Sequence, residues 1–398
     1  MGAMTVARRL RRYAEIVAGE ACLDGEEDVS KRVASVLARV PRHRFLEFFY
    51  HKPWERFFDA EPFETHHLGL EPDEEVLDIV YSDEALITRL DDQGRPSSSA
   101  SQPSLVAAML YLLDLEPGMR VLEIGAGTGY NAALIAELVE DPSLVTTIDI
   151  QSDVVDQTRR LLERNGYGEI RVMYRDGALG APEHGPFDRV VATVGCPDIS
   201  WRWAEQLATA GVALIPLQHG GPAADPLVRL RHADNGLQGG VVSWSGFMPI
   251  QGNLAAHWPE LAIDHTGEPD ARFDLPPSLA EAPLNSDSYR TGRRAWWDFA
   301  YFLALEDTRA YFGGVLALSQ PSGDRIILDN QGVRLWGDRS LYDDFLAAYH
   351  RWESLGYPKL SDWHVRLLPR TEPRPRHDPG AGIWVVSRPA SWQTAQLG

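Results

Sequence analysis

The segment of residues 121–140, VLEIGAGTGYNAALIAELVE, constrains the fold of this chain more than any other part of the sequence. It begins with a short, mostly aliphatic run, continues through glycines at positions 125, 127 and 129, and ends in an apolar pattern with helical spacing. This order predicts a strand, a tight loop and a helix. Glycines let a backbone approach a ligand closely, and a helix N-terminus offers free amide donors, so we expect the loop to be a ligand site.

Predicted strands and helices alternate from about residue 120 to residue 252. The predicted strands are 121–125, 144–150, 170–176, 187–195 and 211–218, the helices are 153–165 and 201–207, and a closing antiparallel pair is 227–233 with 240–250. Such alternation is typical of a parallel sheet covered by helices. The predicted fold class is therefore α/β, with a doubly wound, Rossmann-like sheet.

Two further regions flank this sheet. Two helices are predicted within residues 5–50, and the small polar run 96–102 is predicted to be a loop, after which Pro103 is placed to open a helix. Eight of the twelve tryptophans follow residue 252. A C-terminal α+β domain is predicted there, with a helix near 340–355 and strands near 325–329, 364–368 and 382–387. The predicted division of the chain is 5–100, 101–252 and 253–398.

Composition narrows the possible partners. The net charge of −19 would repel a nucleic-acid backbone, and we interpret the one arginine cluster, residues 8–12, as a solvated helix face. Only Cys22 and Cys196 are present, which excludes a disulfide framework and fits a reducing cytoplasm. The longest apolar run, residues 106–113, is far shorter than the roughly 20 residues that cross a bilayer, so no membrane partner is expected.

The glycine spacing does not match the dinucleotide pattern, because position 130, where a third glycine would be needed, is Tyr130. Glu123 precedes the loop and would repel phosphates but favour a cationic ligand, such as the ammonium or sulfonium group of S-adenosylmethionine. Asp149 ends the next predicted strand about 20 residues past the last glycine, where a carboxylate accepts hydrogen bonds from ribose hydroxyls. The sequence therefore predicts an S-adenosylmethionine site.

The predicted cofactor-binding residues are Glu123, Gly125, Ala126, Gly127, Thr128, Gly129, Asp149, Ile150, Asp176 and Gly177. The pair Asp176-Gly177 is placed to meet the adenine edge, although the same dipeptide is also a common turn. No metal site is predicted, because the only close histidine pair, His66-His67, is better explained as surface residues.

The methyl acceptor is predicted to be a carboxylate. The predicted strand after Asp176 lacks the Asn or Asp followed by Pro-Pro-aromatic that nitrogen methylators use. A carboxylate is already ionised at neutral pH and needs no base, so the enzyme only has to align it and exclude water. Hydroxyls that could aim it lie in residues 97–102, SSSASQ, although a flexible linker would have the same composition.

The sequence resembles the protein-L-isoaspartate O-methyltransferases. The segments that recur in that family, in the same order, are VPRHRF (40–45), YSDEAL (81–86), SQPSLVAAML (101–110), PGMRVLEIGAGTGY (117–130) and RDGALG (175–180). The resemblance implies a class I methyltransferase sheet, S-adenosylmethionine as cofactor and an isoaspartyl side chain as acceptor. It also implies catalytic roles for Ser101 and for Ser99, and it matches the loop glycines, Asp149 and Asp176-Gly177 to cofactor contacts.

Two departures from the family pattern affect the choice of substrate. Ser104 stands where members often carry His or Tyr, and the chain runs on to residue 398 where the repair enzymes nearly end. Longer relatives resemble enzymes that methylate an ordinary Asp in a ribosomally made precursor peptide, whose ester then closes to an aspartimide. We therefore expect peptide tailoring as the main function, repair of isoaspartyl proteins as the alternative, and a non-catalytic cofactor- or peptide-binding homologue as a third possibility.

The C-terminal region has no catalytic pattern of its own. Its aromatic run, residues 296–302, is interpreted as core, because large aromatic side chains supply much of the buried area of a small domain. A groove for the substrate peptide is the competing interpretation, since Trp and Tyr are favoured interface anchors. Cys196 is expected to line the pocket rather than to act as a nucleophile.

Overall fold

The computed structural model describes residues 6–20, 27–52, 62–69, 72–221, 225–256, 267–281, 295–312, 315–329 and 331–398. Two compact units are formed by the chain. Unit 1 comprises residues 1–193, 205–214 and 251–253, and unit 2 comprises residues 194–204, 215–250 and 254–398. Cys22 lies outside the described residues, as does Trp258. Within the described residues, no helix is long and apolar enough to cross a membrane.

A parallel sheet with the strand order β9-β8-β5-β6-β7 forms the centre of unit 1. Its strands are β5 (Val121–Ile124), β6 (Val145–Asp149), β7 (Arg171–Tyr174), β8 (Phe187–Ala192) and β9 (Leu207–Pro216). These segments are rich in Val, Ile and Leu because a parallel sheet is buried on both faces. Chain order reverses at β5, which pairs with β6 on one side and β8 on the other. The glycine loop after β5 therefore lies at the switch point, where α/β sheets bind ligands.

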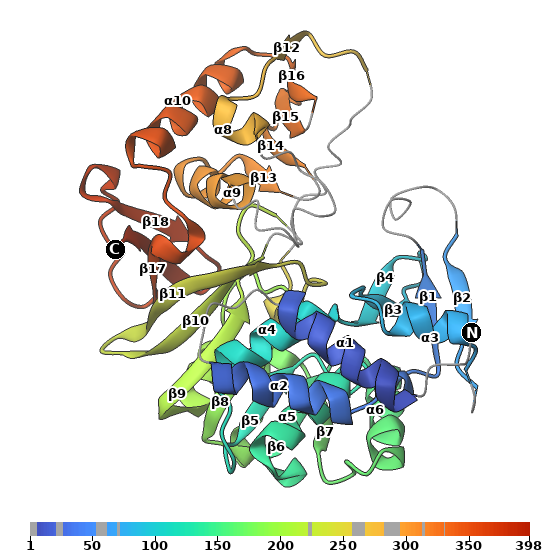
Figure 1. Ribbon diagram of the computed structural model, residues 1–398. Coiled ribbons are helices and arrows are strands. Elements are labelled where there is room, and N and C mark those ends of the chain that lie inside the picture. Colours follow the sequence, from blue (N-terminus) through green and yellow to red (C-terminus); the bar gives the residue numbers. More distant parts are fainter. Residues whose placement is uncertain are drawn as a thin grey trace. The chain divides into compact units, whose positions relative to one another are not determined.

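Helices cover this sheet (Figure 1). They are α1 (Val6–Glu20), α2 (Glu27–Arg39), α4 (Pro103–Leu113), α5 (Tyr130–Val139) and α6 (Ser152–Arg164). A further helix, α7 (Trp201–Gln206), lies between β8 and β9 in the chain. α4 and α5 are apolar on nearly every side, because α2 packs on both of them from outside. α6 is amphipathic and packs on β6 and β7. The arginine cluster of α1 is not wholly solvated, since Arg9 is buried and ion-paired with Glu74 and Asp78.

A small 4-stranded sheet, in the order β2-β1-β3-β4, completes unit 1. Its strands are β1 (Phe48–His51), β2 (Glu64–His67), β3 (Leu86–Leu90) and β4 (Pro96–Ala100), and α3 (Glu74–Val80) precedes β3. The prediction of a loop over residues 96–102 was wrong for its first part, because β4 pairs antiparallel with β3. Serine-rich composition concealed the strand, whose alternate residues Ser98 and Ala100 are nevertheless buried.

Unit 2 contains an antiparallel sheet in the order β18-β19-β17-β11-β10 and a separate 5-stranded sheet in the order β12-β16-β15-β14-β13. The strands of the first are β10 (Asp225–Ala233), β11 (Gly236–Ser245), β17 (Trp363–Pro369), β18 (Ile383–Ser387) and β19 (Ser391–Leu397). Those of the second are β12 (Ala271–Phe273), β13 (Ala310–Phe312), β14 (Leu316–Ser319), β15 (Arg325–Asp329) and β16 (Gly332–Trp336).

The helices of unit 2 are α8 (Pro277–Ala280), α9 (Ala295–Glu306) and α10 (Ser340–Ser354). α9 carries the aromatic run 296–302, and its members Trp296, Phe299 and Phe302 are at most 1% exposed, so the core interpretation is confirmed. The predicted strands near 325, 364 and 382 and the helix near 340 are all present. The sequence did not predict β19, where Ser, Gln and Thr hide an alternation of buried and half-buried residues.

Candidate functional site

The glycine loop joins β5 to α5 and leaves its backbone open. Gly125, Gly127 and Gly129 have φ values of 102°, 52° and 79°, which residues with a side chain rarely adopt. A Cβ on Gly127 would lie 3.1 Å from the carbonyl oxygen of Ser99, so a larger residue would push the loop away from β4. The Thr158 hydroxyl of α6 donates to the Gly127 carbonyl oxygen at 2.7 Å and fixes the loop from the other side. Ala126 and Thr128 are buried within this turn.

Glu123 lies beneath the loop, where its side chain is 0% exposed. One carboxylate oxygen accepts a hydrogen bond from Asn131 Nδ2 at 2.7 Å, and the other accepts one from Thr147 Oγ1 at 2.6 Å. Burial raises the pKa of Glu123 to about 7, with the Asp149 carboxylate adding to the shift. Its bonds to α5 and β6 therefore give Glu123 a role in positioning the loop, and its predicted contact with a cationic ligand stays a prediction.

Asp149 stands at the end of β6 and faces the same loop. Its Oδ2 accepts from the amides of Ala126 (3.1 Å) and Gly127 (3.4 Å), and its Oδ1 accepts from the Gln151 amide at 3.0 Å. Burial raises the pKa of Asp149, and these amide donors oppose the rise. A carboxylate has about four lone-pair positions, and three are used here, so Asp149 keeps one for a bound hydroxyl group.

Asp176 and Ile150 come together beside residue 252. Asp176 Oδ1 accepts from the Ala178 amide at 2.9 Å, and its Oδ2 accepts from the Asn253 amide at 2.8 Å. A Cβ on Gly252 would lie 2.6 Å from Asp176 Oδ2 and 2.7 Å from Ile150 Cδ1. Gly177 is buried and begins a 3₁₀ turn, η4 (Gly177–Leu179). Asp176 thus forms the turn that one interpretation predicted, and it also lies beside Ile150 from the neighbouring loop.

The serine-rich strand β4 lies against the glycine loop and against the loop after β6. Besides the contact of the Ser99 carbonyl with Gly127, the Ser97 carbonyl oxygen accepts from Gln151 Nε2 at 3.0 Å. Ser99 and Ser101 are half-buried. Among the described residues, neither of their hydroxyls makes a hydrogen bond, so both are available to a bound carboxylate. The structure therefore brings the predicted acceptor-side serines to the predicted cofactor loop.

Arg42, in the 3₁₀ turn η1 (Arg42–Phe45), stabilises the end of β4 from the protein interior. Its side chain is 0% exposed and donates to the carbonyl oxygens of Val80 (2.8 Å), Glu84 (2.9 Å), Ala100 (3.1 Å) and Ser101 (3.0 Å). The guanidinium thus fixes the backbone of the catalytic candidate Ser101. Sequence reasoning assigned Arg42 no role, although it belongs to the VPRHRF segment on which the resemblance rests.

Two other positioning residues were also missed. Asp83 Oδ1 accepts from the Ser104 amide at 2.8 Å and its Oδ2 accepts from Ser104 Oγ at 2.7 Å, which satisfies the first turn of α4. Ser104 therefore supports the helix that begins directly after Ser101. Thr193 Oγ1 donates to the Gly125 carbonyl oxygen at 2.8 Å. Asp83 lies in the YSDEAL segment, whereas no pattern in the sequence marked Thr193.

Unit 2 contains Cys196, which is fully buried, and burial raises its pKa well above the ordinary range. Its thiol is therefore protonated at neutral pH, consistent with a packing role rather than nucleophilic chemistry. Over the described ranges, no group of three or more His, Cys, Asp or Glu side chains could hold a metal ion.

These features fit S-adenosylmethionine better than a dinucleotide. The bare backbone of residues 125–129 gives a ligand close access, and Asp149 beside it suits a ribose diol. The buried Glu123 makes the surroundings of the loop unfavourable for a pyrophosphate. A Rossmann-like sheet with this loop at its switch point and a carboxylate at the end of the second strand defines a class I methyltransferase.

Comparison with known proteins assigns the family. Residues 72–253 match the family model described as protein-L-isoaspartate(D-aspartate) O-methyltransferase. A protein-L-isoaspartate O-methyltransferase of Methanococcoides burtonii is 34% identical over 187 residues, which are 47% of this chain and 76% of the relative. The chain belongs to the protein-L-isoaspartate O-methyltransferase family. It is therefore an enzyme of methyl transfer, and its methyl donor is S-adenosylmethionine.

The similarity extends beyond the methyltransferase sheet. A protein-L-isoaspartate O-methyltransferase of Thermotoga maritima is 27% identical over 329 residues, covering 83% of this chain and 89% of the relative. A solved structure of the same name has a TM-score of 0.50 at 23% identity, and it covers 89% of this chain and 95% of its own. This match supports the predicted fold. A protein with this name is therefore similar to the chain into its C-terminal region as well.

Proposed function

We propose that this enzyme transfers a methyl group to the side-chain carboxylate of an isoaspartyl residue in a polypeptide. The observation that carries the proposal is the contact of the serine strand with the glycine loop, where a Cβ on Gly127 would meet the Ser99 carbonyl oxygen at 3.1 Å. An acceptor held by the Ser99 and Ser101 hydroxyls would thus lie beside the methyl donor.

S-adenosylmethionine, which the glycine loop and Asp149 would hold, would supply the methyl group as an electrophile on a positively charged sulfur. The acceptor oxygen is already anionic at neutral pH, so the chain needs no general base. Its residues instead orient the acceptor and hold the two reactants in line. In this proposal the Ser101 hydroxyl donates to the acceptor carboxylate, and Arg42 fixes the backbone that carries it.

Peptide tailoring is the second candidate function. The chain length beyond residue 252 is the observation that favours it. A long C-terminal region does not by itself indicate tailoring, because the Thermotoga maritima relative covers 83% of this chain and bears the name protein-L-isoaspartate O-methyltransferase. Isoaspartyl methylation is therefore the better supported choice, and an ordinary Asp of a precursor peptide is the narrower alternative.

Mass spectrometry of the full-length enzyme with paired peptides tests this choice. The two peptides share one sequence and differ only in carrying isoaspartate or aspartate at one position. We expect the isoaspartyl peptide to gain one methyl group and then to lose methanol as the next backbone amide closes the succinimide. Methylation of the aspartyl peptide alone would favour tailoring. Methylation of neither, with cofactor binding retained, would favour the non-catalytic homologue.

Replacing Ser101 with alanine is expected to lower kcat by about tenfold to a hundredfold, because one hydrogen bond to the acceptor is lost. Affinity for S-adenosylhomocysteine, measured by calorimetry, should stay within about twofold of the parent value. Ser354→Ala in α10 is the control, since this exposed hydroxyl donates to the Arg351 carbonyl oxygen and lies in unit 2. Equal turnover of Ser101→Ala and the parent enzyme would remove Ser101 from the reaction.

A further inference from the structure

The sheet of unit 2 has one buried face and one open face. Alternate residues of β17 and β18, among them Trp363 and Trp384, point to the buried face and are at most 1% exposed. Phe302 of α9 packs on both of these rings, with centroid distances of 6.3 Å to Trp363 and 5.9 Å to Trp384. α9 therefore covers this face, and the intervening residues of each strand form the opposite one.

The strand register identifies the residues of the open face, because directly paired residues point to the same side of a sheet. One row across the strands is Arg231, Gln238, Arg366, Thr394 and Val385. The next row is Arg229, Gly240, His364, Gln396 and Ile383. Every residue in these rows is half-buried or exposed. The rows contain arginine and histidine but neither aspartate nor glutamate.

Further arginines continue this face beyond the end of β17. Arg370 and Arg374 are exposed, and their guanidinium carbons lie 3.7 Å and 5.5 Å from the centroid of the Trp392 ring. Trp392 pairs with Leu368 in the same register and so stands on the open face. Stacking on the indole ring holds the two cations at the surface. We call the two rows, together with Arg370, Arg374 and Trp392, the basic face.

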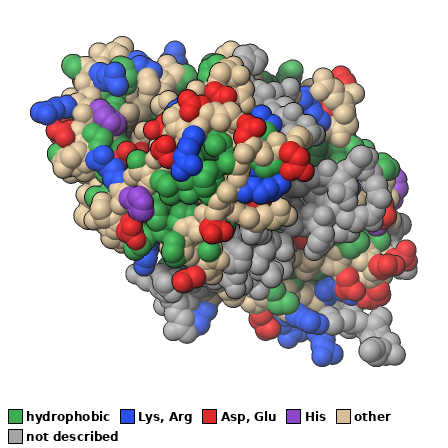
Figure 2. Space-filling model, turned by 90° about the horizontal axis from the view of Figure 1, so that it is seen from above, with side chains coloured by type: hydrophobic (Ala, Val, Ile, Leu, Met, Phe, Trp, Pro, Cys, Tyr) green, Lys and Arg blue, Asp and Glu red, His purple; other side chains and the backbone are tan. Residues whose placement is uncertain are grey.

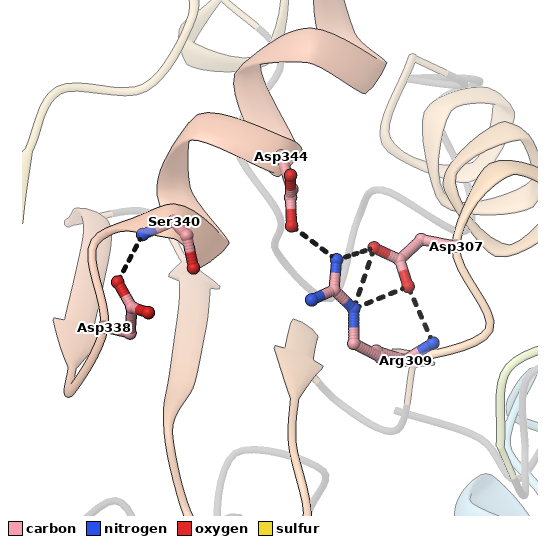
Figure 3. A network of polar contacts seen from close by, with 5 residues as sticks. All are labelled: Asp307, Arg309, Asp338, Ser340 and Asp344. Atoms are coloured by element: carbon pink, nitrogen blue, oxygen red, sulfur yellow. Dashed lines mark hydrogen bonds and ion pairs between the residues drawn. The ribbon is translucent and has the colours of Figure 1, made fainter.

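Several arginines of the basic face have no carboxylate partner among the described residues. Over the part of the chain that the structure describes, Arg231, Arg366, Arg370 and Arg374 form no ion pair with a carboxylate. Arg309, also in unit 2, shows the opposite arrangement, since Asp307 and Asp344 bind it at 2.6 Å and 2.7 Å (Figure 3).

The nearest acidic residues along the chain do not cancel this charge. Asp378 pairs with Arg376 at 3.1 Å. The carboxylates within three residues of the basic face are Asp234, Asp362 and Glu372, against five arginines in that face. In Figure 2, Lys, Arg and His side chains at the left of the view lie among Asp and Glu side chains. A local excess of positive charge therefore stands on a chain whose net charge is −19.

We propose that the basic face binds an acidic segment of the polypeptide substrate, outside the residue that is methylated. The inference rests on the proposed function, because a polypeptide acceptor is what needs a second contact. The basic face attracts acidic chains, whereas the remaining anionic surface of the enzyme repels them. A polypeptide is favoured over a nucleic acid, since the remaining negative charge would repel a long polyphosphate.

The test compares two double variants of the full-length protein with the same change in net charge. Arg231→Glu/Arg374→Glu alters the basic face at two exposed positions. Arg11→Glu/Arg12→Glu alters exposed residues of α1 and is the matched control. Binding of a fluorescently labelled oligoglutamate peptide, which carries no aspartate or isoaspartate, is measured by polarisation at low and high salt. Single-stranded RNA is the competing probe.

We expect the basic-face variant to bind oligoglutamate about tenfold more weakly than the control at low salt, with the difference shrinking as salt rises. The KM for an acidic isoaspartyl peptide should rise by a similar factor, whereas that for a neutral isoaspartyl tripeptide should not change. Equal oligoglutamate binding by the two variants, or tighter binding of RNA to the basic face, would overturn the proposal. Because the polarisation assay needs no methyl transfer, a failure of the proposed function would appear separately, as absent turnover with intact oligoglutamate binding.

Discussion

Replacing Arg42 with methionine is expected to lower the free energy of unfolding by about 3–5 kcal/mol, the cost typical of breaking a buried charged network. The guanidinium is fully buried and is hydrogen-bonded to the carbonyl oxygens of Val80, Glu84, Ala100 and Ser101. Methionine fills a similar volume but donates no hydrogen bond, so these carbonyl groups would be left buried without that donor. Denaturant unfolding followed by far-ultraviolet circular dichroism, which reports the helices of unit 1, measures the loss.

Arg44→Met is the matched control, because Arg44 lies two residues away in the same 3₁₀ turn and its side chain is exposed. We expect its free energy of unfolding to stay within about 0.5 kcal/mol of the parent value. Arg42→Lys separates charge from geometry, since an ammonium group keeps the charge but cannot reproduce the planar fork of donors. If Arg42→Met unfolds at the same denaturant concentration as Arg44→Met, the network does not stabilise unit 1.

A change at Arg42 should also affect turnover more than cofactor binding. The residue contacts the backbone of Ala100 and Ser101 and makes no hydrogen bond to residues 125–129. In a folded Arg42→Lys enzyme we therefore expect a lower kcat at nearly unchanged affinity for S-adenosylhomocysteine.

The central sheet was predictable because its physical cause is local. Buried parallel strands are mostly apolar, as in VLEI and in the VVA end of β8, and glycines with positive φ follow the first of them. The predicted cofactor residues lie on those strands and loops, so their clustering followed from the topology alone. β4 was missed because serine-rich runs are typical of turns, and only pairing with β3 makes residues 96–100 a strand.

Contacts between distant parts of the chain could not be predicted. Arg42 binds carbonyl groups 38 to 59 residues away, and a backbone acceptor leaves no pattern in a sequence. The same limit applies to Glu123, whose carboxylate turned out to be bonded to Thr147 and Asn131 in the interior. The basic face needed the register of several strands, since Arg231 and Arg366 share a row only because β11 lies between β10 and β17.

Asp149→Ala is expected to raise the dissociation constant for S-adenosylhomocysteine by about tenfold to a hundredfold. One charge-assisted hydrogen bond to a ribose hydroxyl contributes about 1.5–3 kcal/mol, and a factor of ten corresponds to about 1.4 kcal/mol. The substitution also removes the acceptor of the Ala126 and Gly127 amides, so the loop loses part of its support. Isothermal calorimetry on the full-length variant gives the affinity, and a melting curve shows whether the fold is kept.

Asp149→Asn and the pH dependence distinguish direct contact from support of the loop. The asparagine oxygen can still accept from the loop amides, but its nitrogen cannot accept from a hydroxyl. If Asp149 contacts the ribose directly, Asp149→Asn should therefore lose most of the affinity that Asp149→Ala loses. Burial raises the pKa of Asp149, and the protonated acid is a poorer acceptor. Parental affinity should therefore weaken as the pH falls toward that pKa, and neither variant should show this dependence. Asp156→Ala on the exposed side of α6 is the control, and an Asp149→Ala affinity equal to that of this control would exclude Asp149 from the cofactor site.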